Sequence, residues 1–322
     1  MKSHDIFVIV IISLFLSLIV VRFQIYEFAK RGFVATDYYK VDLRKIPTCG
    51  GISLLIVFFI ILAMMMVFDK VSNFEMISSV TVLLFGIFGL LDDFVDVGRI
   101  TKVLVPFFFS VPISFAIDST SMILPLVGEI NLGLLYIYLI VPIYIMVVAN
   151  LVNMHSGFNG LAVGLSAILM LFLLVKSMIF NRNLTFTLSC MLGAVLGLLY
   201  YNWYPSRIFD GNVGAMTMGA TIGIGIVACG FLVSGFIMLI PHTVNFLMYV
   251  YWRIMRRLYP NDERWKLLKF GEVGEDGTLK VPNGLTLKWL LPYHFRMTER
   301  RVVLYMYALT VVFCLISLPI PY

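Results

Sequence analysis

A cluster of charged residues lies between two long apolar runs, in residues 90–102 of this 322-residue chain. It holds three carboxylates, at Asp92, Asp93 and Asp96, and two cations, one of which is Lys102. Charges beside a membrane helix are costly unless they pair, bind an ion or face water, so they mark a candidate site. Asp92 and Asp96 would share one helix face, and carboxylates beside a lysine suit a hard cation and a phosphate. A solvated helix end with an internal salt bridge is an equally weighted alternative.

A run of amides occupies residues 150–160, where one apolar stretch ends and another begins. Asn150, Asn153 and Asn159 share this run with His155, and glycines interrupt the helix before the next stretch. Asparagine carbonyl oxygens can bind Mg²⁺, and asparagine amides can read the hydrogen-bonding edge of a base. Amide hydrogen bonding between helices is the alternative.

A third polar turn, residues 205–214, follows an aromatic stretch and carries Asp210 and Asn212. We expect both side chains to reach the same hollow as Asp92 and Asn153. A Mg²⁺ site usually takes one or two carboxylates and leaves its other positions to water and substrate phosphates. The turn is therefore a candidate metal site, with helix capping by Asp210 as the alternative.

The composition indicates the class of protein that must position these residues. Hydrophobic residues make up 61% of the chain and charged residues 13%, and the mean hydropathy is +0.97. A soluble core could not bury this much apolar surface, so the sequence predicts a polytopic membrane protein. The net charge of +6 is then interpreted through membrane topology and not as a sign of nucleic-acid binding.

Ten apolar runs are long enough to cross a bilayer as helices. They cover residues 5–28, 50–68, 75–91, 102–118, 132–149, 160–180, 186–203, 213–229, 231–252 and 301–319. We therefore expect one all-α domain over residues 1–322, with about ten transmembrane helices. Lysine and arginine are concentrated in alternate loops, which leaves the other loops with only Lys2, Lys70, Lys176 and Arg182. The positive-inside rule then places both termini outside the cytoplasm and every polar cluster on the cytoplasmic side.

The last cytoplasmic loop, residues 253–300, is a polar insert in this domain. Asp276 and Gly277 lie between two short β-prone pieces of the loop. This pattern predicts a hairpin, and hence a small, partly β loop region.

Together these motifs resemble those of the polyprenyl-phosphate N-acetylhexosamine-1-phosphate transferases, from the turn at residues 47–51 to the ninth apolar run. The specific parts are Asp92-Asp93 with Lys102, Asn150-x-x-Asn153, Asn159-Gly160-Leu161, the run 199–207 with Phe209-x-Gly211, and Pro241 with Asn245-Phe246-Leu247. Ser156 and Asn159 stand where the bacterial branch has aspartates. The chain is therefore most similar to the eukaryotic and archaeal branch, which transfers GlcNAc-1-phosphate to dolichyl phosphate. Ten helices with both ends outside the cytoplasm also agree with this family.

The resemblance implies catalytic roles for Asp92, Asp93 and Lys102. By matched position, Asn153 and Asn212 would be ligands of Mg²⁺, or of Mn²⁺ as an alternative. The family has aspartate at the second of these positions. We expect a nearby carboxylate, Asp210, to restore the missing charge, directly or through a metal-bound water.

The resemblance also implies substrate-binding residues. Phe209 would stack on uracil, and Asn159 would hydrogen-bond the edge of that base. The last loop would cover the nucleotide sugar and contribute Lys269, His294 and Arg296 to its diphosphate. A juxtamembrane basic patch that holds anionic lipid headgroups is an equal alternative for each of these loop residues.

The implied reaction transfers GlcNAc-1-phosphate from UDP-GlcNAc to a polyprenyl or dolichyl phosphate, releases UMP and initiates glycan assembly, as in protein N-glycosylation. The protein would be an integral glycosyl-1-phosphate transferase of the cell membrane, or of the endoplasmic reticulum in a eukaryote. It would lie among membrane lipids, and a homodimer is left open. The main alternative is a non-catalytic relative that binds lipid or nucleotide sugar. A secondary transporter is less favoured, because no inverted repeat is visible and the carboxylates lie at helix ends.

Overall fold

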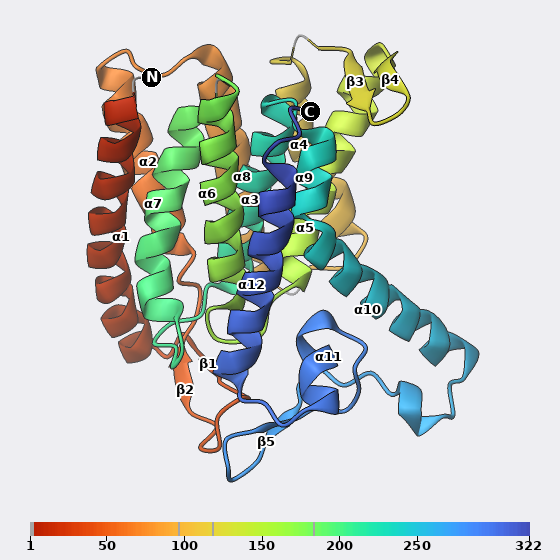
Figure 1. The fold of residues 1–322 in the computed structure, drawn as a ribbon. Coiled ribbons are helices and arrows are strands. Elements are labelled where there is room, and N and C mark those ends of the chain that lie inside the picture. Colours follow the sequence, from red (N-terminus) through yellow and green to blue (C-terminus); the bar gives the residue numbers. More distant parts are fainter. Residues whose placement is uncertain (1–2, 96, 118, 183) are drawn as a thin grey trace.

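The computed structural model describes residues 3–95, 97–117, 119–182 and 184–322, and these form an upright bundle of helices (Figure 1). The helix α1 begins at the same end of the bundle at which α12 ends, and α11 and β5 lie at the opposite end (Figure 1). The helices are α1 Ser3–Arg31, α2 Ile52–Val67, α3 Asn73–Phe94, α4 Thr101–Ser114, α5 Val141–Met154, α6 Leu161–Ile179, α7 Thr185–Asn202, α8 Gly211–Ala228, α9 Leu232–Met238, α10 Ile240–Leu258, α11 Leu287–His294 and α12 Glu299–Ser317.

Within the described residues, seven helices are long and apolar enough to cross a membrane. They are α1, α3, α5 with the π-helical turn Tyr136–Ile140 before it, α6, α7, α8 and α12. The bent pair of α9 and α10 would make an eighth, and α2 and α4 are shorter apolar helices. The predicted helical membrane protein is confirmed, because each predicted apolar run coincides with one helix or, for the ninth run, with this pair.

The ninth apolar run differs from the prediction of one continuous helix over residues 231–252. Helix α9 ends at Met238, and α10 continues at an angle of 66° to it. Pro241 lies in the first turn of α10, where its missing N–H leaves no helical hydrogen bond unmade. The proline therefore starts a second helix with its own direction.

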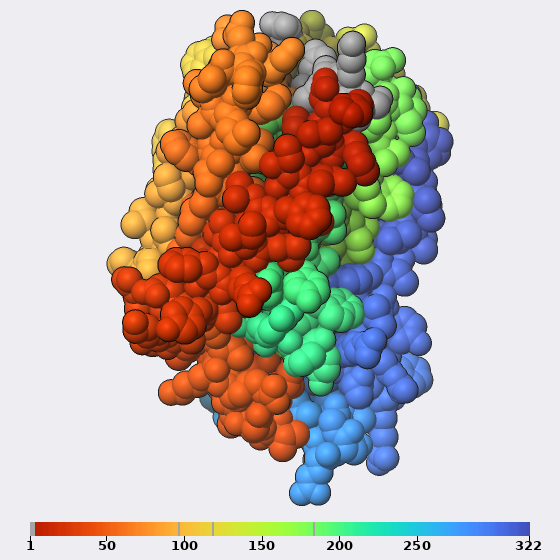
Figure 2. All heavy atoms as spheres, turned by 90° about the vertical axis from the view of Figure 1, so that its left-hand side faces the viewer, coloured from red at the N-terminus to blue at the C-terminus, as the bar shows by residue number. Residues whose placement is uncertain are grey.

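The N-terminal helix α1 packs closely against α7 on one side of the bundle (Figure 2). A methyl group at Gly193 would lie 2.2 Å from the carbonyl oxygen of Val10, and one at Gly197 would lie 2.5 Å from Cβ of Ser17. The Ser17 hydroxyl donates to the carbonyl of Ala194 at 2.7 Å. Small residues four apart allow this approach of two backbones, a common way of joining helices in a bilayer.

Helix α8 lies at the centre of the bundle, between α3 and α5. A methyl group at Gly219 of α8 would lie 2.6 Å from Cα of Ala149 in α5. On the other side, a methyl group at Gly89 of α3 would lie 2.5 Å from the carbonyl oxygen of Asn212, at the start of α8. These close contacts hold α8 against α5 and α3, with the start of α8 beside the last turns of α3.

Three antiparallel strand pairs complete the described structure. The predicted hairpin around Asp276-Gly277 is confirmed, because β5 (Glu272–Val273) pairs with β6 (Leu279–Lys280) and Gly277 has a left-handed φ of +76°. The pattern did not predict β1 (Val34–Thr36) with β2 (Lys45–Pro47), nor β3 (Ser121–Leu124) with β4 (Gly128–Asn131).

Candidate functional site

Asp92 and Lys102 form an ion pair between the end of α3 and the start of α4. The Lys102 Nζ lies 2.9 Å from Asp92 Oδ1, and the two side chains are 2% and 30% exposed, respectively. The same carboxylate oxygen accepts a hydrogen bond from the N–H of Val97 at 2.9 Å. A buried carboxylate is thus fixed beside a partly exposed lysine. Asp96, which the sequence placed on the same face, lies outside the described residues.

Asp93 holds the N-terminus of α8. Its carboxylate accepts hydrogen bonds from the N–H groups of Asn212 at 2.8 Å and Val213 at 3.0 Å. The first turn of a helix has unpaired N–H groups and a positive dipole end, so an anion there is stabilising. Gly211 makes room for this contact, because a methyl group on it would lie 2.6 Å from Asp93 Oδ2. Its φ of +72° also favours glycine.

Asp210 occupies the capping position of α8, but its side chain makes no capping hydrogen bond. Helix capping therefore does not account for this carboxylate, because Asp93 from another helix performs it. Burial raises the pKa of Asp210 to about 7, and the nearby carboxylate of Asp93 contributes in the same direction. A cation beside Asp210 would favour its ionised form.

The end of α5 brings the amide run to the start of α4. The side-chain amide of Asn150 donates to the carbonyl of Lys102 at 3.3 Å and to that of Met146 at 2.9 Å. Asn153 lies about one helical turn further towards the same end of α5. Within the described residues, the side-chain oxygens of Asn153 and Asn212 accept no hydrogen bond. Both oxygens are therefore available as hard ligands for a divalent cation.

The available donors fit magnesium rather than a metal held entirely by protein. Among the residues that the structure describes, no three histidine, cysteine, aspartate or glutamate side chains form a ready metal cluster. Asp210 would supply one carboxylate and Asn153 and Asn212 two amide oxygens, which together would be a sparse oxygen set. Magnesium typically accepts such a set, because it keeps water and substrate phosphate in its other positions.

Phe209 lies in a turn that joins the start of α8 to the end of β2. Its N–H donates to the carbonyl of Pro47 at 2.9 Å, and its carbonyl accepts from the N–H of Gly50 at 2.7 Å. A methyl group at Gly51 would lie 2.2 Å from the backbone of Gly214, so glycine permits this contact. The turn at residues 47–51 and the segment that carries Phe209 therefore form one structural unit. The Phe209 side chain is partly exposed.

Asn159 is the centre of a buried polar network. Its amide oxygen accepts from the N–H of Ser206 at 2.7 Å, and its amide nitrogen donates to Asp37 at 3.2 Å. Its own N–H donates to Glu299 at 2.6 Å. Lys40 Nζ joins the two carboxylates, at 3.2 Å from Asp37 and 2.6 Å from Glu299. Asn159 itself is only 2% exposed, so contact with a base requires movement of its neighbours.

The sequence did not identify Asp37, Lys40 and Glu299 as functional residues. In the sequence, Lys40 is one of several positive charges in the first loop, and Glu299 precedes the last apolar run. Glu299 lies 140 positions from Asn159 in the sequence, and no local pattern pairs them. The one signal in the sequence was that Lys40, Asp37 and Glu299 are charged residues that flank apolar runs.

The last loop is fastened to the turn between α5 and α6. Asn245 of α10 donates to the carbonyl of Met154 at 3.2 Å and accepts from the N–H of Leu287 at 3.0 Å. Lys288 of α11 donates to the carbonyl of Ser156 at 2.6 Å. Burial lowers the pKa of Lys288 to about 8. These contacts place α11 directly over the amide run, which agrees with a loop that covers the site.

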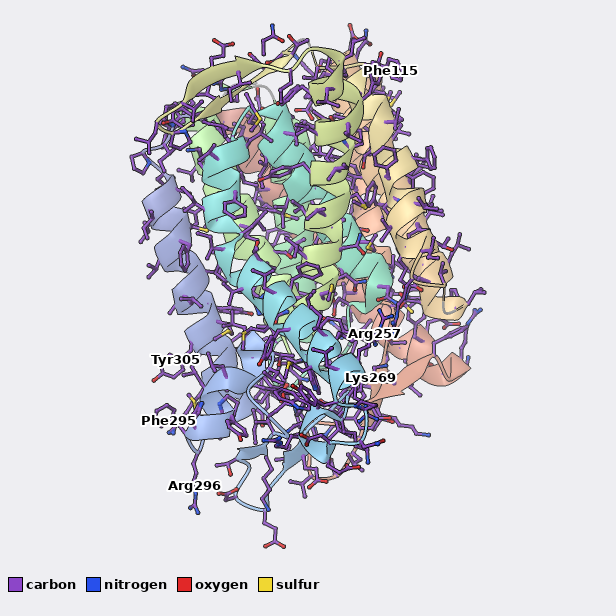
Figure 3. The ribbon with its side chains drawn as sticks, turned by 90° about the vertical axis from the view of Figure 1, so that its right-hand side faces the viewer. Phe115, Arg257, Lys269, Phe295, Arg296 and Tyr305 are labelled. Atoms are coloured by element: carbon purple, nitrogen blue, oxygen red, sulfur yellow. The ribbon has the colours of Figure 1, made fainter. Side chains whose placement is uncertain are left out.

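The three basic loop residues lie at the surface of this cover. Lys269, His294 and Arg296 are all exposed. Figure 3 shows Arg296 pointing away from the helices at the far end of the loop, whereas Lys269 lies nearer the bundle. The imidazole of His294 lies among the rings of Tyr293 and Phe295. The structure does not gather these three side chains at one point, and a shared contact with a diphosphate stays a prediction.

The fold and the site together define an integral membrane protein with a charged site at the common end of α3, α4, α5 and α8. Residues 75–230, which cover these helices, match the model of glycosyl transferase family 4. The chain is 32% identical over 320 residues to a protein of Saccharolobus solfataricus, a match that covers 96% of this chain and 94% of the relative. The chain belongs to glycosyl transferase family 4.

The relatives of this chain carry two different designations. The Saccharolobus protein is provisionally designated UDP-N-acetylglucosamine–dolichyl-phosphate N-acetylglucosaminephosphotransferase. A protein of Sulfolobus acidocaldarius with the same designation is 28% identical over 322 residues, which cover 96% of this chain and 94% of that relative. The phospho-N-acetylmuramoyl-pentapeptide-transferase of Clostridium kluyveri is 30% identical over 208 residues, which cover 59% of this chain and 64% of that enzyme.

Proposed function

We propose that this protein transfers GlcNAc-1-phosphate from UDP-GlcNAc to dolichyl phosphate or a related polyprenyl phosphate, with release of UMP. The product is a lipid-linked diphosphate sugar on which a glycan is assembled. The observation that carries this proposal is the near full-length similarity to the two archaeal relatives that bear this designation. The Asp92–Lys102 pair and the amides at the end of α5 lie inside the matched region.

Phosphoryl transfer of this kind depends mainly on positioning the two substrates and on neutralising the charge of their phosphates. A phosphate monoester is already largely dianionic at pH 7, so the acceptor needs no strong base to activate it. Lys102 supplies a positive charge for the transferring phosphate, and Asp92 fixes the direction of that lysine. When bound, Mg²⁺ would neutralise further charge on the diphosphate. Asp210, Asn212 and Asn153 are the residues that would hold it.

Asp210 should set the magnesium requirement. With Asn212 in place of the family's aspartate, Asp210 is the carboxylate that restores the charge of the site. We expect Asp210→Ala to raise the Mg²⁺ concentration needed for half-maximal activity by about tenfold. Adding Asn212→Asp to this variant should recover much of the loss. A magnesium titration of the two variants measures both effects, and an unchanged titration curve for Asp210→Ala would rule out this compensation.

Phe209 should contribute a stacking surface for uracil. We expect Phe209→Ala to weaken binding of UDP-GlcNAc and UMP together, by about 1–3 kcal/mol, the range for a base stacked on an aromatic side chain. Affinity for the lipid phosphate should not change. Calorimetric titration with UMP, and with the lipid phosphate in detergent, separates the two. Equal loss of both ligands would indicate a folding defect instead.

The proposed membrane topology has ten spans and a cytoplasmic site. Helix α9 with the first turns of α10 would make one span, and the two shorter helices α2 and α4 would make two more, so that the seven long helices become ten spans. The cationic loops favour a cytoplasmic site, with both termini outside the cytoplasm. The nucleotide sugar would then bind from the cytoplasm, and the lipid phosphate would arrive from the surrounding membrane.

A second candidate function is that of a non-catalytic relative which binds nucleotide sugar or lipid phosphate. Asn212 favours this alternative, because the site loses a negative charge relative to the family. Incubation of purified protein with a panel of UDP-sugars against dolichyl and undecaprenyl phosphate tests both functions. Magnesium-dependent release of UMP, greatest with UDP-GlcNAc, supports the proposed function. Binding of the same substrates without release of UMP supports the alternative.

A further inference from the structure

Helix α10 leaves the bundle instead of continuing through it. It follows the 66° break after α9 and extends to one side, away from α5 and α12 (Figure 1). Most of its residues therefore have no neighbouring helix on their outer side. The side chains that it presents there show what environment it meets.

One face of α10 is fixed by the rest of the protein. Asn245 is buried and bonds to both the α5–α6 turn and the start of α11. Trp252 is 2% exposed, and its ring lies 5.9 Å from that of Trp289 in α11. These contacts set the rotation of α10 about its own axis, so the direction of its other faces is also set.

An exposed apolar stripe covers another face of α10. Leu247, Tyr251, Ile254 and Leu258 are 57%, 49%, 51% and 63% exposed, respectively. Their spacings of four, three and four residues place them on one side of the helix. Within the part of the chain that the structure describes, Trp265 contacts Tyr251, with ring centres 6.0 Å apart, and each of the four side chains is still about half exposed or more. Apolar side chains in such a row avoid water best in hydrocarbon.

A row of arginines borders the apolar stripe. Arg253 and Arg257 each precede a residue of the stripe, Ile254 and Leu258, so they lie about 100° round the helix from it. No carboxylate among the described residues forms a salt bridge with either arginine. In the view of Figure 3, Arg257 is level with the lower ends of the bundle helices and lies above Arg296 of the loop. Arg257 therefore lies at the level at which the apolar surface of the bundle gives way to the polar loop.

We propose that the part of α10 beyond Asn245 lies along the bilayer surface on the side of the candidate site, with its apolar stripe in the hydrocarbon. Arg253 and Arg257 bind the phosphate groups of anionic phospholipids, such as phosphatidylglycerol, in that leaflet. An apolar face bordered by cations is the pattern of helices that lie in a membrane interface. A second copy of the chain fits less well, because pairing two α10 stripes would bring two rows of arginines together. The proposal does not depend on the reaction that the protein catalyses.

The test uses the full-length protein with one fluorophore on α10. All four native cysteines are buried, so Ile254→Cys provides a single accessible thiol for bimane. Lys266→Cys, in the exposed part of the loop, is the water-facing control. The protein is placed in phosphatidylcholine vesicles that contain brominated phosphatidylglycerol or brominated phosphatidylcholine. Quenching by bromine reports contact with lipid chains, and quenching by iodide reports contact with water.

We expect brominated lipid to quench the label at position 254 and iodide to quench the label at position 266. Brominated phosphatidylglycerol should quench position 254 at lower mole fractions than phosphatidylcholine. Arg253→Gln and Arg257→Gln should each weaken this preference by about fivefold. The matched control is Arg264→Gln, which should have no effect, because Asp262 lies 2.7 Å from that guanidinium.

Three outcomes would overturn the proposal. Iodide quenching at position 254 would place the stripe in water. A preference for phosphatidylglycerol that survives both arginine substitutions would remove the assigned binding residues. Displacement of brominated phosphatidylglycerol by equimolar polyprenyl phosphate, but not by unbrominated phosphatidylglycerol, would assign the arginines to the acceptor lipid instead.

Discussion

Asp92→Asn and Lys102→Ala should each lower the turnover number of the purified protein by a factor of about 10² or more. Lys102→Ala removes the positive charge that faces the transferring phosphate, and Asp92→Asn removes the carboxylate that orients this lysine. Loss of one preorganised donor in such a site typically costs about 10²–10³ in turnover. Asparagine keeps the shape of Asp92 and can still accept the hydrogen bond from Val97. The loss should therefore come from the missing charge rather than from the local fold. Steady-state release of UMP under saturating substrate is the measurement.

The control for this pair is Asp69→Asn, an exposed carboxylate in the turn between α2 and α3 at the other end of the bundle. It should leave turnover unchanged. Thermal unfolding in detergent should also be similar for all three variants. Near-normal turnover in both Asp92→Asn and Lys102→Ala would reduce the ion pair to a helix-end salt bridge.

Lys40→Met should destabilise the protein by about 3–5 kcal/mol, the usual cost of leaving a buried charge without its partner. The substitution leaves the carboxylates of Asp37 and Glu299, which are 2% and 3% exposed, without the ammonium group between them. The same change should weaken binding of UDP-GlcNAc, because Asn159 is held by both carboxylates. Thermal unfolding in detergent and a UMP titration measure the two effects.

A double variant tests whether the uncompensated charge causes the loss of stability. Adding Glu299→Gln to Lys40→Met removes one of the two uncompensated carboxylates, so roughly half of the lost stability should return. Lys30→Met, on the exposed end of α1, is the matched control and should be neutral. If Lys40→Met alone is also neutral, the network does not support Asn159 in the way described.

The long apolar runs predicted most of the fold, because a bilayer requires each span to satisfy its own backbone hydrogen bonds. Local composition is then enough to locate a helix such as α6 or α8. Local composition does not predict the direction in which a helix runs relative to the bundle. The break before Pro241 turns α10 out of the bundle, and mean hydropathy averages over such a break.

The candidate site was predictable where its residues are close in the sequence. Asp92 and Lys102 flank one short connection, and the structure pairs them. Asp93 adjoins Asp92 in the sequence, yet its carboxylate serves the distant start of α8. Partners that lie more than a hundred positions apart depend on how the helices pack. A single sequence carries no signal for that packing.

The central claim is that the phosphate attached to the sugar moves together with the sugar, and it can be tested with a doubly labelled substrate. UDP-GlcNAc carrying ³H in the sugar and ³²P in the β-phosphate is incubated with purified protein, Mg²⁺ and dolichyl phosphate, and the lipid is extracted. The proposed reaction predicts both labels in the lipid product at an unchanged ratio, with unlabelled UMP in the aqueous phase. Tritium alone in the lipid, with ³²P retained in released UDP, would show ordinary glycosyl transfer and contradict the account.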